Sequence, residues 1–279
     1  MQNCRINDLI SVQLNNLKLV NGLKLIEPRQ TAGSLAAYDG LESEELLQFR
    51  QIFRSELEVT IAGWESFPGN LLSPIKNQVD LPDNLFGCLV TYYNEIYGED
   101  MNVEFGSVSN LFDKGLQNDS FIVVQPTIKQ CGRIRVAAEI FGSALAPRYK
   151  KSSHILAKFT QENESTELWP GTVQFYFEYV LWLPTIGERT HKLAYVKWYQ
   201  PVDNHQTRFY CRTENNDDRS VNIELWKLGE FHEMSRDSII PIHNIYSRFI
   251  PAKFTIGRND NNRRKTYMAV IPINRKFHL

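Results

Sequence analysis

The residues from His154 to Arg248 form a succession of short, aromatic-rich stretches separated by turn-forming residues. In the longest stretch, residues 170–184, every second residue from Val173 to Leu183 is apolar. A period of two is that of a β-strand, because successive side chains of a strand point to opposite faces of a sheet. Strands this short and this frequent predict an all-β barrel or sandwich-like module.

The first 120 residues have a different pattern. Ser43 followed by acidic residues is typical of a helix start, and we expect a helix over residues 44–57. A second helix is expected from Pro82, with Gly98 as its stop signal. The stretch between them, residues 64–76, contains two prolines and a glycine and is expected to be a loop.

The predicted fold class is therefore α+β, with two regions. A helical, acidic N-terminal segment would cover residues 1–120, and a mainly antiparallel β-barrel module would cover residues 121–279, with its core at residues 153–279. The charge distribution follows a similar division. Residues 1–125 contain 17 acidic and 8 basic residues, a balance of −9, whereas residues 126–279 contain 15 acidic and 23 basic residues, a balance of +8. This asymmetry indicates either a polyanionic partner for the second region or attraction between the two halves.

The cysteines and the first residues of the sequence indicate in which cellular compartment the protein is found. The four cysteines lie far apart and form no CxxC pair, which is typical of reduced thiols in the nucleus or cytosol. The first residues lack the layout of a secretory signal. No stretch reaches the roughly 18 apolar residues of a membrane span. We therefore expect a nuclear, or else cytoplasmic, protein without a membrane partner.

Sequence motifs for catalysis are absent. The sequence contains no phosphate-binding glycine loop, no GxSxG motif, and no pair of histidines at HxH or i, i+4 spacing. We therefore predict no catalytic residues, no metal site and no cofactor. His243, which lies among apolar residues, is expected to be buried and hydrogen-bonded.

Two sets of side chains are candidates for partner binding. Several aromatic residues are predicted to lie on the outward faces of the strands, where rings attract cationic groups, although they could instead pack under loops or against the N-terminal helices. Two basic clusters could neutralise phosphates, or be ordinary surface loops. The aromatic candidates are Tyr176, Trp182, Tyr195, Tyr199 and Tyr210, and the basic candidates are Arg133, Arg135, Arg148, Lys150, Lys151, Arg263, Arg264 and Lys265.

The order of the later strands resembles the bromo-adjacent homology (BAH) module of chromatin proteins. The segments Val196–Tyr199, Glu224–Trp226 and Ile240–Arg248 hold the places of that family's characteristic strands. The resemblance covers about residues 153–279. It implies a small β-barrel that binds chromatin, and in some of these modules an aromatic cluster holds a methylated ammonium group.

A second resemblance covers more of the chain. Residues 133–159, 170–184, 236–254 and 267–279 are similar to the C-terminal part of fungal proteins related to Tnp2/CACTA-type transposases, and residues 81–100 are similar to the linker ahead of that part. In those proteins the catalytic carboxylates lie in a separate upstream domain, which has no counterpart here. The resemblance implies a transposon-derived, non-enzymatic interaction module that binds chromatin or a nucleoprotein partner. Two alternatives stay open, namely direct, salt-sensitive nucleic-acid binding through the basic loops and a truncated transposase fragment without activity.

Overall fold

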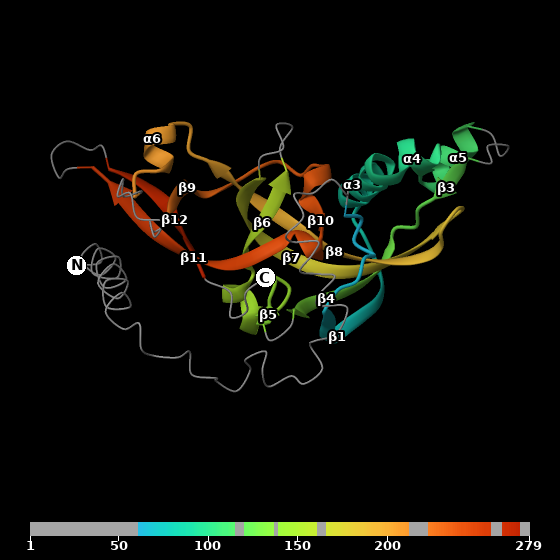
Figure 1. Ribbon diagram of the computed structural model, residues 1–279, viewed down its shortest axis with the longest axis horizontal. Coiled ribbons are helices and arrows are strands. Elements are labelled where there is room, and N and C mark those ends of the chain that lie inside the picture. Colours follow the sequence, from blue (N-terminus) through green and yellow to red (C-terminus); the bar gives the residue numbers. More distant parts are fainter. Residues whose placement is uncertain are drawn as a thin grey trace.

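Two long strands form the spine of the structure. The computed structural model describes residues 61–114, 120–136, 139–160, 166–211, 223–257 and 264–273. Within them, β7 (Thr166–Leu183) and β8 (Gly187–Pro201) form an antiparallel hairpin that runs along most of the elongated molecule (Figure 1). The alternation that the sequence shows in residues 173–183 is therefore confirmed as a strand.

The other strands extend from this hairpin into one ten-stranded sheet. Its order is β1-β4-β7-β6-β11-β12-β9-β8-β10, with β5 on β4, and all of its ladders are antiparallel. A separate parallel pair, β2 (Glu104–Gly106) and β3 (Phe121–Val123), lies next to the helices. The remaining strands are β1 (Gly69–Asp80), β4 (Thr127–Val136), β5 (Glu139–Phe141), β6 (His154–Thr160), β9 (Glu224–Phe231), β10 (Ile239–Pro241), β11 (Ile245–Ile256) and β12 (Lys265–Pro272).

The predicted fold class is wrong in two respects. First, the described strands do not close into a barrel, since β8 and β9 are paired only at Tyr199–Phe231 and Pro201–Trp226, with an irregularity between. Second, the described part of the N-terminal region begins with strand β1 and not with a helical segment. The helix expected over residues 44–57 lies outside the described residues.

Strand β1 occupies the stretch that was expected to be a loop. It lies at the edge of the sheet and pairs with β4, with irregularities between Leu72 and Ile75 and between Lys76 and Val79. An edge strand tolerates proline at an irregularity, because no second neighbour needs its N–H group, and this explains how Pro74 fits. At Gly69, a Cβ would lie 2.0 Å from the carbonyl oxygen of Arg135, so glycine permits the close approach to β4. The β1–β4 ladder crosses the boundary expected at residue 120.

The helix predicted from Pro82 is confirmed as α3 (Asp83–Tyr93). Gly98 does not end the helical segment, because the chain continues through the π-helical turn η2 (Asn94–Gly98) into α4 (Glu99–Met101) and ends at Asn102 in the left-handed conformation. The Asn94 side chain binds both the N–H and the C=O of Phe105, each at 2.9 Å, and so ties this turn to β2. A further helix, α5 (Val108–Lys114), follows. No described helix has the length and apolarity that a membrane crossing requires.

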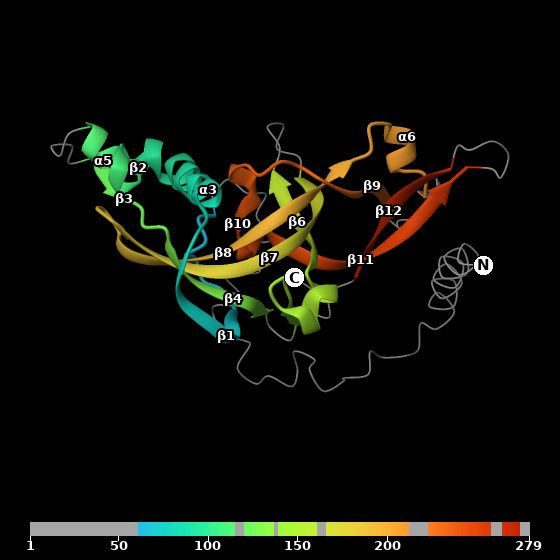
Figure 2. The same cartoon turned by 180° about the vertical axis from the view of Figure 1, so that it is seen from behind.

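The two faces of the β7–β8 hairpin contribute to different cores. Val173 and Tyr176 belong to a core shared with β4, β5 and β6, whereas Phe177 and Tyr179 belong to a core beneath α3 (Figures 1 and 2). A register irregularity lies between Val173 and Phe175. Such a bulge inserts one residue and therefore exchanges the faces of the residues that follow it, so that Tyr176 shares a face with Val173. Both faces of the hairpin are buried in this middle part, whereas Trp182 near the turn is exposed.

A buried histidine lies in the core beneath α3. The Tyr97 hydroxyl and the His191 Nε2 atom are 2.7 Å apart, and the ring of Tyr93 contacts the imidazole edge-on. Burial lowers the pKa of His191 to about 4, because the charged imidazolium would lose its hydration there. The imidazole is therefore neutral near pH 7, and its Nε2 atom can accept a hydrogen bond from the Tyr97 hydroxyl.

We expect the free energy of unfolding to fall as the pH is lowered from about 6.5 to about 4. Over this range the unfolded chain protonates its histidines while folded His191 does not, so the unfolded state gains up to about 3 kcal/mol from this group. The expected slope is smaller in His191→Gln, measured by urea unfolding at a series of pH values. Burial also lowers the pKa of His154 and His243, so part of the slope remains. The control is His205→Gln at an exposed histidine; an unchanged slope in His191→Gln would contradict the assignment.

Candidate functional site

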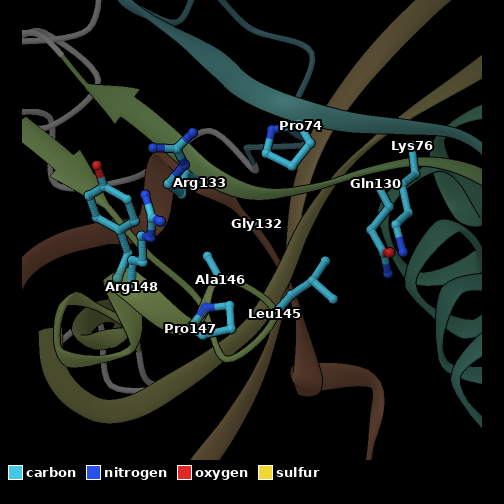
Figure 3. Close-up of a pocket in the computed structure, with 10 residues that line it drawn as sticks. Pro74, Lys76, Gln130, Gly132, Arg133, Leu145, Ala146, Pro147 and Arg148 are labelled. Carbon is cyan, nitrogen blue, oxygen red and sulfur yellow. The ribbon is translucent and has the colours of Figure 1, made fainter.

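A pocket with three cationic side chains lies between β1, β4 and the segment after β5. Lys76 and Gln130 line one side, and Arg133 and Arg148 line the other (Figure 3). Its volume is about 500 Å³, within the range of ligand-binding pockets. We call it the basic pocket, and it is lined by Pro74, Lys76, Gln130, Gly132, Arg133, Leu145, Ala146, Pro147, Arg148 and Tyr149.

The floor of the basic pocket is held in place by hydrogen bonds to the sheet. The Ser143 hydroxyl donates to the carbonyl of Gly132 at 2.7 Å, and the N–H groups of Ala144 and Leu145 donate to carbonyls of β7 at 2.8 and 3.1 Å. The chain then turns into the 3₁₀-helix η3 (Pro147–Ser152), which folds back against Gly142. These contacts fix the position of η3, and with it the positions of Arg148 and Tyr149.

Arg133 is oriented by two contacts. One of its Nη atoms donates to the carbonyl of Ser73 in β1, and its guanidinium lies over the ring of Tyr149, 4.6 Å from the centroid. A guanidinium has five N–H donors, so these contacts leave donors for a ligand. None of the lining residues is acidic, and among the described residues no carboxylate forms an ion pair with Arg133 or Arg148. The pocket is therefore electropositive.

The first predicted basic cluster is thus partly assembled into one site. Arg133 and Arg148 line the pocket, and Lys150 and Lys151 are exposed on η3 beside it. Arg135 is exposed on β4 but does not line the pocket. Sequence reasoning missed Lys76, because it comes from β1, which the prolines had indicated to be a loop.

The second predicted basic cluster lies elsewhere. Arg264 and Lys265 are exposed at the start of β12, and Arg263 lies outside the described residues. In both views the β11–β12 end of the sheet lies at one end of the molecule, away from β1, β4 and β5 (Figures 1 and 2). The structure therefore does not join this cluster to the basic pocket.

Three of the five predicted outward aromatics are buried, and for these the prediction of an exposed ring is wrong. Tyr176 is fully buried and donates its hydroxyl to the carbonyl of Gly142 at 3.1 Å. Tyr195 is buried in the core beneath α3, and Tyr199 is buried with its hydroxyl 3.0 Å from that of Thr172. The reason is that the middle part of the β7–β8 hairpin is covered on both faces, so strand alternation does not identify an exposed side there.

The other two predicted aromatics are exposed but do not meet. Trp182 is 64% exposed near the β7–β8 turn, and Tyr210 is 58% exposed after the short helix α6 (His205–Arg208), against Phe254. The turn and α6 lie toward opposite ends of the molecule (Figure 1). The predicted aromatic cluster is therefore not formed by these residues.

A different group of aromatic residues lines a second pocket of about 680 Å³. We call it the aromatic pocket. Sequence reasoning missed it because its rings come from three strands and a loop, which no local pattern brings together. Its lining residues are Phe159, Trp169, Trp198, Gln200, His232, Glu233, Ser235 and Asp237.

Searches for metal sites and for similar proteins give no further assignment. Among the described residues, no group of three or more His, Cys, Asp or Glu side chains is arranged to hold a metal ion. Comparisons with protein-family models, with curated proteins and with solved structures find no match. The resemblances to the BAH module and to the transposase-related proteins therefore stay predictions.

The predicted burial and hydrogen bonding of His243 are confirmed. The side chain is buried, and its Nε2 lies 3.2 Å from the carbonyl oxygen of Glu65.

We expect Gly142→Ala to destabilise the protein and displace η3. A Cβ at this position would lie 2.2 Å from the carbonyl oxygen of Tyr149. Such a backbone clash costs about 1–3 kcal/mol, which thermal unfolding would detect as a lower melting temperature. The matched control is Gly87→Ala on α3, where a Cβ meets no atom within 4 Å. Alanine there should raise stability by up to about 1 kcal/mol. Equal stability of Gly142→Ala and the wild type would contradict the packing described for η3.

Proposed function

We propose that the chain is a non-enzymatic binding module that holds the phosphate backbone of a nucleic acid at the basic pocket. The observation that carries the proposal is the convergence of Lys76, Arg133 and Arg148 in one pocket without an acidic lining residue. Each phosphate that such side chains neutralise releases counterions, and this makes binding favourable and dependent on salt.

The apolar part of the pocket supports the same partner. Leu145, Ala146 and Pro147 form its lower wall (Figure 3). Tyr149, whose ring lies under the Arg133 guanidinium, also lines the pocket. Aromatic rings and guanidinium planes stack on nucleobases irrespective of the base. A single strand could therefore place a phosphate among the cations and a base against this wall.

The basic surface continues beyond the pocket. Lys150 and Lys151 are exposed in the last turn of η3, two and three residues after Arg148. A row of cations of this kind follows a phosphate backbone and does not read base edges, so we expect binding with little sequence selectivity.

The lining residues favour binding over catalysis. The pocket contains no carboxylate, histidine, cysteine or serine side chain. General acid–base and nucleophilic catalysis of phosphate chemistry commonly use these groups or metal ions held by them. A nuclear role on chromatin, as the resemblances imply, would present the pocket with DNA phosphates, so this proposal includes a transposon-derived chromatin or nucleoprotein module as its setting.

The proposal predicts that the double variant Arg148→Ala/Lys150→Ala binds nucleic acid more weakly than the wild type. Removing two phosphate contacts should reduce the slope of log Kd against log salt concentration by about 1–2. The measurement is fluorescence anisotropy of a labelled single-stranded oligonucleotide and of a duplex, at a series of KCl concentrations. Both residues are exposed, so the melting temperature of the variant should equal that of the wild type.

The matched control is Arg264→Ala/Lys265→Ala, which removes the same charge at the start of β12. We expect this variant to keep the wild-type salt slope. Equal losses in both double variants would show that net charge, and not the basic pocket, determines binding. Absence of binding by the wild type near 50 mM KCl would contradict the proposed function altogether.

A further inference from the structure

The aromatic pocket has an aromatic floor and a polar rim. Its floor consists of Trp198, which is buried, and of Phe159 and Trp169, which are half-buried. The residues that line it from the segment after β9 are polar and exposed, namely His232, Glu233, Ser235 and Asp237. A ligand in this pocket therefore meets ring faces on one side and hydrogen-bonding groups around its edge.

The two indoles offer the ligand their faces and not their N–H groups. The Nε1 atom of Trp198 donates to the carbonyl of Asp237 at 2.7 Å, and that of Trp169 donates to a carboxylate oxygen of Glu167 at 3.1 Å. Phe159 meets Trp198 edge to face, with ring centroids 5.2 Å apart. The floor is therefore an apolar surface whose polar atoms already have partners.

Trp169 is held in place from behind. Glu167, which binds its indole, also pairs with Arg208 at 2.6 Å, and Arg208 pairs in turn with Glu224 at 2.9 Å. The Arg208 guanidinium lies over Trp226, the ring that packs edge-on against Trp169. The position of the Trp169 ring is thus fixed before a ligand arrives, which reduces the entropy cost of binding.

The polar groups at the edge of the pocket are mainly hydrogen-bond acceptors. Among the described residues, Glu233 forms no ion pair. Gln200 donates through its Nε2 atom to the carbonyl of Phe231 at 3.0 Å, which commits its amide donor and leaves its Oε1 atom as an acceptor. A ligand that suits this edge therefore supplies several donors of its own.

The charge of the pocket excludes anions but does not favour a cation strongly. Asp237 pairs with Arg236 at 3.1 Å, so its charge is offset within the chain, and the carboxylate of Glu233 is the remaining negative group of the lining. The volume of about 680 Å³ is also more than one ammonium or guanidinium group would fill, and it lies within the range of about 300–1,000 Å³ for drug-sized ligands. These features together favour a neutral ligand of several rings that is rich in hydroxyl groups.

We propose that the aromatic pocket binds a neutral oligosaccharide built of pyranose rings. The faces of a pyranose consist of C–H groups with a partial positive charge, which the negative face of an aromatic ring attracts. Its edge carries hydroxyl groups, which donate strong charge-assisted hydrogen bonds to a carboxylate. These two parts match the floor and the rim of the pocket, and Glu233 would repel sugars that carry carboxylate or phosphate groups. The inference uses other residues than the proposed function and does not depend on it.

The first test is a titration of the full chain with four neutral trisaccharides, namely cellotriose, maltotriose, mannotriose and chitotriose. Calorimetry measures the affinity, and tryptophan fluorescence reports contact with the floor. We expect at least one trisaccharide to bind with a Kd below about 1 mM. Sorbitol, which has the hydroxyl groups without the ring faces, and the anionic trigalacturonate should bind at least about tenfold more weakly. No binding of any of the four, or equal affinity for sorbitol or trigalacturonate, would overturn the proposal.

The second test separates a neutral ligand from a cation. Binding of a neutral trisaccharide should be the same at about 50 and about 500 mM KCl, whereas salt weakens the attraction between a cation and an exposed carboxylate. The cationic probe is N-acetylarginine amide, which also has a flat face and peripheral donors. Tighter binding of this probe than of the best trisaccharide, or trisaccharide binding that falls steeply with salt, would overturn the assignment to a neutral sugar.

The third test changes the pocket itself. Trp169→Leu removes the π face and Glu233→Ala removes the acceptor, and we expect each to weaken binding of the best trisaccharide about 3- to 10-fold. The matched controls are Trp182→Leu and Glu230→Ala, at exposed residues that do not line the pocket. Thermal unfolding identifies a variant that fails to fold, and Glu233, being exposed, keeps the test valid if Trp169→Leu does so. Unchanged affinity in the folded pocket variants would contradict the proposal.

The variants of the two pockets also distinguish the two proposals from each other. Glu233→Ala should leave oligonucleotide binding close to the wild-type value, and Arg148→Ala/Lys150→Ala should leave trisaccharide binding unchanged. Loss of trisaccharide binding in the Arg148→Ala/Lys150→Ala variant would show that the sugar occupies the basic pocket instead, and would overturn this assignment.

Discussion

The structure depends on a β7–β8 hairpin whose middle part is buried on both faces. A single irregularity between Val173 and Phe175 puts Val173 on the same face as Tyr176, in one core, whereas Phe177 and Tyr179 lie on the other face, in the core beneath α3. With strict alternation along the whole strand, Val173 would have shared the face of Phe177 and Tyr179. The inserted residue instead lets one hairpin support helix α3 on one side and the pocket-bearing strands on the other.

Much of the local structure could be predicted because it is encoded by neighbouring residues. The alternation in residues 173–183 and the start of α3 at Pro82 are such cases, and both are confirmed. Strand β1 could not be predicted in this way. Pro74 indicates a loop when judged locally, and it is compatible with a strand only because β1 lies at an edge and is irregular there. Closure of the sheet was also beyond a local pattern, since it depends on how β8 and β9 pair, and that pairing is interrupted by an irregularity that neither strand's alternation shows.

The candidate sites show the same limit. Arg148, Lys150 and Lys151 could be grouped from the sequence because they lie within four residues, and one short helix, η3, holds them together. Lys76 joins them through a contact between β1 and β4, which has no local signal. For the aromatic residues, the period of two identified strands correctly but gave the wrong exposure for Tyr176, Tyr195 and Tyr199. Exposure depends on what covers each face, and the covering elements, which are α3, the loop after β5 and strands β9 and β11, come from other parts of the sequence.

The two pockets are supported by one short segment of β7, and this constrains how a partner could use both. Trp169 forms a wall of the aromatic pocket, while the carbonyls of Val173 and Gln174 hold the floor of the basic pocket. The backbone between them is paired on both sides, with β6 and with β8 around Gly171. The separation of the pockets is therefore fixed by a continuous ladder and not by a loop. For a partner that contacts both pockets, occupation of one pocket would raise the effective concentration of the partner at the other. A partner that contacts only one pocket would gain nothing from the second, so discrimination between the two kinds of partner would follow from geometry that neither pocket has alone.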